Sequence, residues 1–247
     1  MKKILLSVII TYYKKKNYIK KTLKSLENQS FKNYQVILVY DDPDKTDLNY
    51  IKKLLFRFKN RTIIINKKNL GVAKSRNIAS RYVKGKYTAY LDSDDIWKKN
   101  KIKNQLSAML KKNMDLSYTS FLIINEHDTT IGKRIISKKT SYQKLIKRCE
   151  IGLSTVIVKS TIIKKFKFPE IKTQEDFGLW LKLLRNNYKF LAINTIYSSW
   201  RKDSGSLSSN KIQKIIDAFK LFYKYENKNL IFSIYSVVIL SINKLIN

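Results

Sequence analysis

Short, uninterrupted apolar runs alternate with amphipathic segments over the first hundred residues of this chain. The runs predict β-strands at 5–10, 36–40, 62–65 and 87–91, and apolar spacing between them predicts helices at 18–26, 48–58 and 72–83. Strands without polar alternation are buried on both faces, which is typical of a parallel sheet covered by helices. The sequence therefore predicts an α/β fold with a doubly wound, mostly parallel sheet and helices on both faces.

The order of elements changes after residue 97. We expect helices at 98–112, 141–148 and 176–186, and strands at 116–124, 131–136, 154–158 and 189–200. With six Gly and two Pro in 247 residues, the chain shows no linker and no repeat. We expect one domain over 1–209, with halves at 1–97 and 98–209, followed by a C-terminal helical tail over 210–247.

The composition excludes several classes of protein. A single cysteine, Cys149, rules out a disulfide framework and a zinc cluster, and His127 is the only histidine. Most catalysis based on His or Cys is thereby excluded. The chain has 51 Lys and Arg against 18 Asp and Glu, a net charge of +33, but only 8 of these cations are Arg. Nucleic-acid readers favour Arg, so we expect no nucleic-acid partner.

The tail combines an amphipathic segment with an apolar one. Segment 211–226 carries apolar residues on one helical face with lysines opposite, and 229–243 is uncharged and strongly apolar. The second stretch is shorter than the roughly 20 residues that span a bilayer. We expect it to pack on the core or on a partner, which permits a homodimer, or to lie on a membrane surface.

In the predicted sheet, each of the first four strands leads into a segment of polar, aromatic or acidic residues. These residues are Thr11 to Tyr13, Asp41 and Asp42, Asn69 to Gly71, and Asp92 to Asp95. Ligands of open parallel sheets bind beyond the carboxyl ends of the strands. The four segments therefore predict one binding pocket.

The segment Asp92-Ser93-Asp94-Asp95 holds the most specific chemistry. Three carboxylates within four residues repel one another unless a cation or hydrogen-bond donors lie among them. Hard oxygen ligands suit Mg²⁺ or Mn²⁺, which bind through one or two carboxylates together with substrate phosphates. The alternative is a solvated acidic turn that caps the next helix.

Three other segments have both a functional and a structural interpretation. Residues 69–77 run from a loop into a helix and offer backbone N–H groups, Lys74 and Arg76 to an anion, or form an ordinary capped helix. Asp41 and Asp42 either accept from a nucleobase or ribose, or form a turn. Glu175-Asp176 either takes part in catalysis or stabilises the first turn of a helix.

Taken together, these motifs resemble the family 2 glycosyltransferases. The match rests on Ser7-Val8-Ile9-Ile10-Thr11-Tyr12, Asp41-Asp42, Asn69-x-Gly71 with Ala73-x-x-Arg76-Asn77, Leu91-Asp92-Ser93-Asp94-Asp95 and Glu175-Asp176. It covers roughly residues 4–209. The resemblance implies the GT-A fold, an inverting reaction and a nucleotide-sugar donor, with UDP expected as the nucleotide. The Gln-x-x-Arg-Trp signature of processive synthases is absent around Trp200-Arg201, which favours the addition of one sugar.

The resemblance also implies roles for individual residues. Asp176 would be the general base, and Asp94 would hold Mn²⁺ or Mg²⁺ against the diphosphate. The other implied contacts to the donor are Thr11 and Tyr13 at the nucleotide, Asp42 at the uracil, Asn69 and Arg76 at the uridine, Asp92 at the donor, and Arg201 at the leaving diphosphate.

This resemblance predicts an enzyme that adds a sugar to a glycan or lipid-linked acceptor in bacterial surface polysaccharide or lipopolysaccharide synthesis. The expected location is the cytoplasm, at the inner face of the cytoplasmic membrane. Two alternatives remain open. A sugar-nucleotide nucleotidyltransferase would use a similar sheet, but a glycine-rich first loop is expected there and Thr11 to Lys14 is not one. A non-enzymatic polyanion binder would rely on lysine alone.

Overall fold

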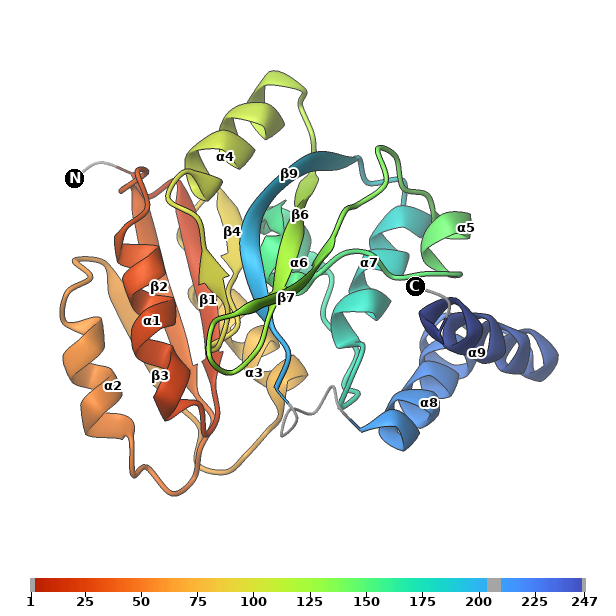
Figure 1. The fold of residues 1–247 in the computed structure, drawn as a ribbon, viewed down its shortest axis with the longest axis horizontal. Coiled ribbons are helices and arrows are strands. Elements are labelled where there is room, and N and C mark those ends of the chain that lie inside the picture. Colours follow the sequence, from red (N-terminus) through yellow and green to blue (C-terminus); the bar gives the residue numbers. More distant parts are fainter. Residues whose placement is uncertain (1–2, 204–209, 246–247) are drawn as a thin grey trace.

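The structure, a computed structural model, describes residues 3–203 and 210–245 (Figure 1). The strands are β1 (Leu6–Tyr12), β2 (Tyr34–Tyr40), β3 (Arg61–Ile65), β4 (Tyr87–Tyr90), β5 (Ile96–Trp97), β6 (Leu116–Ile124), β7 (Thr130–Arg134), β8 (Ile157–Lys159) and β9 (Phe190–Arg201). The helices are α1 (Lys16–Glu27), α2 (Leu48–Leu55), α3 (Val72–Ala79), α4 (Lys101–Lys111), α5 (Tyr142–Leu145), α6 (Ser160–Lys165), α7 (Glu175–Arg185), α8 (Lys211–Lys220) and α9 (Leu230–Leu245).

One mixed sheet joins both halves of the chain, in the order β3-β2-β1-β4-β8-β6-β9-β5, with β7 paired to β6. Strands β1 to β4 pair in parallel, and β6 is also parallel to β9. The chain adds β2 and β3 on one side of β1 and then returns to place β4 on the other side. The carboxyl ends of β1 and β4 therefore form the switch point at which open α/β sheets bind ligands.

The sheet is buried on both faces, as the uninterrupted apolar runs predict. Successive side chains of a strand point to opposite faces. Val8 and Ile10 of β1 therefore pack with α1, α2 and α4, whereas Ile9 packs with α3, α6 and α7. All three side chains are at most 1% exposed. The predicted α/β fold with helices on both faces is confirmed.

The structure differs from the predicted elements in three places. Residues Leu153–Thr155 form a 3-10 turn, and the strand expected at 154–158 is β8, which lies antiparallel to β4 and β6. Helix α6 was not predicted, and neither was β5, whose two residues pair with the far end of β9. Short elements of this kind depend on pairing with distant strands, so local periodicity does not reveal them.

The tail folds back on the α7 side of the molecule as α8, a π-helical turn over Leu221–Tyr225, and α9 (Figure 1). Leu221 and Phe222 are fully buried, and a Cβ on Gly178 of α7 would lie 2.6 Å from Leu221 Cδ1, so the two segments pack closely. No helix in the described part of the chain is both long enough and apolar enough to cross a bilayer.

Candidate active site

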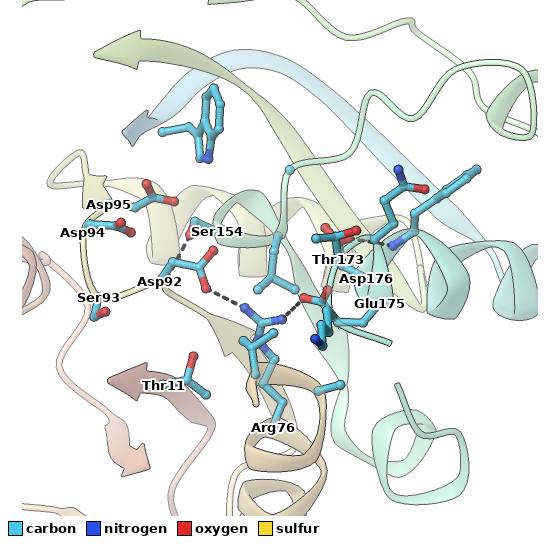
Figure 2. Close-up of a pocket in the computed structure, with 18 of the residues that line it drawn as sticks. Thr11, Arg76, Asp92, Ser93, Asp94, Asp95, Ser154, Thr173, Glu175 and Asp176 are labelled. Carbon is cyan, nitrogen blue, oxygen red and sulfur yellow. Dashed lines mark hydrogen bonds and ion pairs between the residues drawn. The ribbon is translucent and has the colours of Figure 1, made fainter. Parts of the chain in front are cut away.

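An open cleft of about 1320 Å³ lies at the switch point between β1 and β4 (Figure 2). Both halves of the chain line it. The predicted site residues on its wall are Thr11, Tyr13, Asn69, Arg76, Asp92, Asp94, Asp176 and Arg201. The structure therefore brings these eight residues together from positions up to 190 apart in the sequence.

The acidic turn after β4 is fixed by hydrogen bonds at several points. The Asp92 N–H donates to Ser154 Oγ (3.0 Å), and the Asp95 N–H donates to the Asp92 carbonyl (3.1 Å). Asp95 Oδ1 accepts from the Arg201 N–H (2.8 Å). Burial, with the neighbouring Asp94 and Asp92 carboxylates adding to it, raises the pKa of Asp95 well above its ordinary value. Asp95 thus has a structural part in the turn, while Asp92 and Asp94 are more accessible from the cleft.

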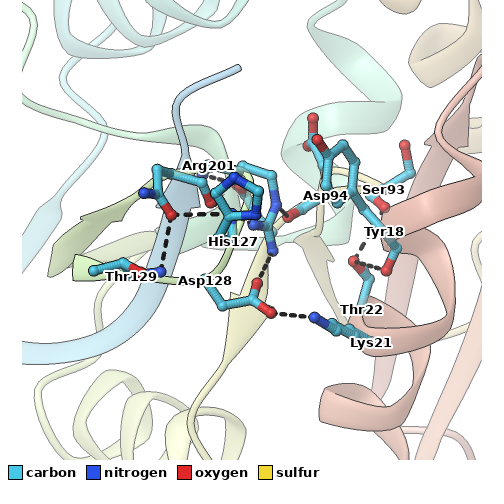
Figure 3. A network of polar contacts seen from close by, with 11 residues as sticks. Tyr18, Lys21, Thr22, Ser93, Asp94, His127, Asp128, Thr129 and Arg201 are labelled. Carbon is cyan, nitrogen blue, oxygen red and sulfur yellow. Dashed lines mark hydrogen bonds and ion pairs between the residues drawn. The ribbon is translucent and has the colours of Figure 1, made fainter. Parts of the chain in front are cut away.

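Arg201 holds this turn against the end of β9 (Figure 3). Its side chain is buried, and Nε donates to the Asp94 carbonyl (2.9 Å). The remaining guanidinium nitrogens bind the Asn125 carbonyl (2.6 Å) and the Asp128 carboxylate, which also binds Lys21. The guanidinium also lies 4.5 Å from the centre of the Tyr18 ring. Contact of Arg201 with a leaving diphosphate stays a prediction, because in this structure its nitrogens bind protein groups.

Lys15 links two carboxylates beside the acidic turn. Its ammonium nitrogen lies 2.9 Å from Asp94 Oδ2 and 2.7 Å from Asp203 Oδ2. Burial alone would lower the pKa of Lys15, but Asp94 and Asp203 outweigh it and raise that pKa. Two carboxylate oxygens on different segments therefore converge on one cation.

Arg76 joins the two sides of the cleft (Figure 2). Its guanidinium donates to Asp92 Oδ1 at 2.7 Å through one nitrogen and to the Glu175 carboxylate through another. Only 4% of Arg76 is exposed. Burial opposes its charge, but Asp92 and Glu175 raise its pKa above the ordinary value. The predicted uridine contact of Arg76 stays a prediction; the structure shows it as a bridge between the acidic turn and α7.

Asp176 lies in the first turn of α7 and faces the cleft, half-buried. Burial, followed by the charge of Glu175, raises the pKa of Asp176 to about 7, although Arg76 acts in the opposite direction. A carboxylate with such a pKa can accept a proton effectively near neutral pH. The geometry and the pKa both suit a general base.

A contact with the tail supports the residues before Asp176. Asp217 of α8 is buried, and its Oδ2 accepts from the Thr173 N–H (2.9 Å) and the Thr173 hydroxyl (3.0 Å). The next residue, Gln174, has a left-handed backbone with φ of 63°. Such a conformation is uncommon for a residue with a side chain. Asp217 thus helps to hold the turn from which α7 begins.

The loop before α3 uses its backbone donors within the protein. The N–H groups of Leu70 and Gly71 donate to the Asp41 carboxylate (both 2.9 Å), and Asn69 Nδ2 donates to the Asp41 carbonyl (3.2 Å). The anion expected beside these N–H groups is therefore Asp41 itself. Asp42 is buried and does not line the cleft, so its predicted contact with uracil stays a prediction.

Sequence reasoning gave no role to several residues of the site. Ser154, Lys15 and Asp203 belong to no local motif. Asp217 lies in a segment that the sequence identified only as an amphipathic helix. Glu175 was noticed beside Asp176, but its ion pair with Arg76 spans 99 residues. The sequence did contain a signal for this pair. A buried acid needs a partner of opposite charge, so an acid in the first turn of a helix with no other partner indicates a buried Arg elsewhere in the chain.

Comparisons with known sequences agree with this site. The profile of the family described as Glycosyl transferase family 2 matches residues 7–171. Escherichia coli WfgD, a UDP-Glc:alpha-D-GlcNAc-diphosphoundecaprenol beta-1,3-glucosyltransferase, is 36% identical over 212 residues, which is 85% of this chain and 82% of WfgD. TuaG of Bacillus subtilis (strain 168), a putative teichuronic acid biosynthesis glycosyltransferase, is 31% identical over 213 residues, with coverage of 85% and 83%.

Solved structures share the fold. TarS of S. aureus in complex with UDP-GlcNAc aligns with a TM-score of 0.74 at 22% identity, over 90% of this chain and 65% of that one. The mannosyltransferase PcManGT from Pyrobaculum calidifontis, in complex with GDP-Man and Mn²⁺, aligns with a TM-score of 0.69 at 14% identity, over 91% and 64%. This chain thus spans slightly less than two thirds of each solved chain, and the predicted GT-A fold is confirmed.

The matched profile includes the strand ends, the acidic turn and Arg76, and its last residue lies just before the turn that carries Asp176. Together with the identity to WfgD over most of both chains, this match shows the relationship. The chain belongs to the family 2 glycosyltransferases.

Proposed function

We propose that this protein transfers one sugar from a UDP-sugar to a hydroxyl group of a glycan or lipid-linked acceptor, with inversion, in bacterial surface polysaccharide synthesis. One observation carries the proposal. Asp94 and Asp176 line the same cleft, and the contacts Asp92–Arg76–Glu175 connect the segments on which they lie. The name of WfgD gives UDP-Glc as donor and a diphosphoundecaprenol-linked sugar as acceptor, which supports the substrate classes.

The two halves of the domain would bind different substrates. Residues 1–97 would bind the nucleotide through Thr11, Tyr13, Asp42, Asn69 and Asp92. Residues 98–209 would supply the acceptor site and the base, and 210–247 would form the tail. The structure supports this assignment, because the segments that follow β1 to β4 line the cleft, whereas Leu153–Thr155 and the start of α7 line it from the other half.

The side chains at the acidic turn suit a divalent cation. Asp94 and Asp203 already direct one oxygen each at the Lys15 ammonium, and Mg²⁺ or Mn²⁺ prefers such hard oxygen ligands. In residues 3–203 and 210–245, no three His, Cys, Asp or Glu side chains are grouped so that they could hold a metal ion. Asp94, with Asp203, would therefore hold Mn²⁺ or Mg²⁺ together with donor phosphates. A bound divalent ion neutralises the charge that develops on a departing diphosphate.

Asp176 would act on the acceptor. Its carboxylate takes the proton from the acceptor hydroxyl, whose oxygen then forms a bond to the anomeric carbon. The bond from that carbon to the diphosphate breaks, and its electron pair leaves with UDP. Because attack and departure are on opposite faces, an α-linked donor gives a β-linked product.

Calorimetric titration of UDP tests the donor site. We expect micromolar affinity with Mn²⁺, and at least tenfold weaker binding with a chelator or in Asp94→Asn, because one ligand of the cation is lost. The exposed Asp44→Asn is the matched control and should bind UDP as the wild type does. UDP binding that is the same with chelator and in Asp94→Asn, but falls steeply with salt, would instead indicate a polyanion-binding protein that holds the nucleotide through lysines.

The pKa of Asp176 predicts the pH dependence of turnover. A base must be deprotonated, so kcat/KM for the acceptor should fall about tenfold per pH unit below about 7, at saturating donor. Above that pH the rate should level off. A profile that stays flat down to pH 5 would contradict the assignment of Asp176.

The tail would contact the surface of a membrane, at the inner face of the cytoplasmic membrane. Several large apolar side chains of α8 and α9 are exposed: Ile212, Ile215, Ile216, Ile231, Ile234, Tyr235 and Val238. Lysines at 211, 224 and 228 occur in the same part of the sequence, and this combination favours binding to anionic lipid.

Sedimentation with vesicles tests this contact. Ile231→Ser with Ile234→Ser should weaken binding to phosphatidylglycerol vesicles at least fivefold, because both side chains are exposed, at 81% and 52%, and their loss leaves the core intact. Replacement of the exposed Phe56, far from the tail, by Ser is the control. Unchanged vesicle binding, together with a loss of self-association, would assign the surface to a homodimer.

A further inference from the structure

Besides the residues already described, two arginines line the cleft. Arg134 ends β7 and Arg148 follows α5, and both lie on the cleft wall together with Cys149 and Thr173. Arg is rare in this chain, with 8 Arg against 43 Lys. The two arginines therefore stand out from the lysine background.

Neither arginine forms an ion pair within the described residues, although the charge of Glu150 acts on Arg134 in the direction that raises its pKa. Within residues 3–203 and 210–245, no carboxylate oxygen lies within 4.0 Å of either guanidinium. The acid closest in sequence, Glu150, accepts instead from the Ser137 N–H (3.1 Å) and hydroxyl (2.9 Å). Burial, followed by the charge of Arg148, lowers the pKa of Arg134. Two like charges that face one cavity in this way are stabilised by an anion between them.

The tail lies next to Arg148. Asn243 of α9 donates through Nδ2 to the carbonyl of Lys147 (2.9 Å), the residue before Arg148, and Leu240 and Asn243 line the cleft. Further along α9, Ile234 and Val238 are exposed. A cationic pair beside an exposed apolar helix matches an amphiphile with an anionic head and a hydrocarbon chain.

The site also lies within electrostatic reach of the base. Asp176, Cys149 and both arginines line the same cleft, and Cys149 follows Arg148 directly. After burial, the charge of Asp176 is the next largest cause that raises the pKa of the Cys149 thiol. An anion held by the two arginines would therefore place the group attached to it near Asp176.

We propose that Arg134 and Arg148 bind the diphosphate of a lipid-linked acceptor and thereby direct its sugar hydroxyl toward Asp176; this rests on the proposed glycosyltransferase function. Guanidinium groups bind phosphate oxygens through two parallel N–H donors, which fixes orientation as well as charge. The hydrocarbon chain leaves the cleft along α9.

Kinetics with two matched acceptors tests the proposal. One acceptor carries N-acetylglucosamine on an undecyl diphosphate, and the other carries the same sugar linked directly to undecanol. In Arg134→Gln/Arg148→Gln, KM for the diphosphate acceptor should rise about 30-fold, because two charge-assisted contacts are lost. KM for the undecanol glycoside and the affinity for UDP should not change. Arg81→Gln, an exposed arginine outside the cleft, is the control.

A binding measurement separates this proposal from the proposed function. Inorganic pyrophosphate is titrated into protein saturated with UDP and Mg²⁺, so that the donor site is occupied. Binding that is present in the wild type and in Arg81→Gln but lost in the double variant supports the arginine site, even if neither acceptor is used. Equal pyrophosphate binding in all three proteins, or an equal rise of KM for both acceptors, would overturn it. Arg134→Lys/Arg148→Lys, which keeps the charge, should restore part of the affinity and excludes misfolding as the cause.

Discussion

Replacement of Asp176 by Asn should lower kcat about 1000-fold while the affinity for UDP stays unchanged. Asn has nearly the shape of Asp but does not accept a proton from the acceptor hydroxyl, and general base catalysis contributes roughly 10²- to 10⁴-fold. Asp176 lies in α7, outside the acidic turn that would hold the nucleotide and metal, so donor binding is preserved. Single-turnover rates with a saturating donor, together with UDP calorimetry, measure the two effects separately.

The matched control is Glu126→Gln, an exposed acid in the β6–β7 hairpin. It should retain the turnover of the wild type. Turnover near that of the wild type in Asp176→Asn would mean that another group takes the proton. A product with retained anomeric configuration, read from the proton coupling constant by NMR, would contradict direct displacement altogether.

Replacement of Arg76 by Gln should lower the free energy of unfolding by about 3 kcal/mol. The guanidinium is the partner of both Asp92 and Glu175, and its removal leaves Glu175, which is 7% exposed, as an unpaired buried charge. Loss of one partner of a buried pair typically costs about 3–5 kcal/mol. Urea unfolding followed by tryptophan fluorescence measures the change.

A double variant separates the charge effect from a packing effect. In Arg76→Gln/Glu175→Gln the unpaired charge is gone, so more than half of the lost stability should return. A double variant that is as unstable as Arg76→Gln alone would show that the loss comes from packing against Phe168, whose ring centre lies 5.6 Å from the guanidinium. Arg76 also lowers the pKa of Asp176, so the acid limb of the rate profile should move to higher pH in a folded Arg76 variant.

The first half of the fold could be predicted because its information is local. Val8, Ile9 and Ile10 are apolar without interruption since both sheet faces are covered, and the polar residues come where the strands end. The acidic turn at Asp92 and Asp94 could be found for the same reason. Its chemistry is contained in four consecutive residues.

The remaining parts depend on pairing between distant segments. Trp97 joins the sheet only because β9 presents Ser198 to it, and Arg76 finds Glu175 in another element. The apolar face of 211–226 was recognised, but Ile212 and Ile215 lie on the surface of the folded protein while Leu221 and Phe222 are buried. Periodicity shows that a helix has an apolar face; what covers that face depends on the arrangement of the whole molecule.

The hydrogen bonds from Thr173 to Asp217 have a consequence for chimeric enzymes. They connect the turn before α7 to α8, across the boundary predicted between the domain and its tail. An exchange of tails between relatives would therefore also replace a residue that supports the turn before Asp176. A chimera joined after residue 220 keeps Asp217 with Thr173 and should preserve turnover. A chimera joined at residue 210 also replaces Asp217, so that exchange of the tail would change turnover as well.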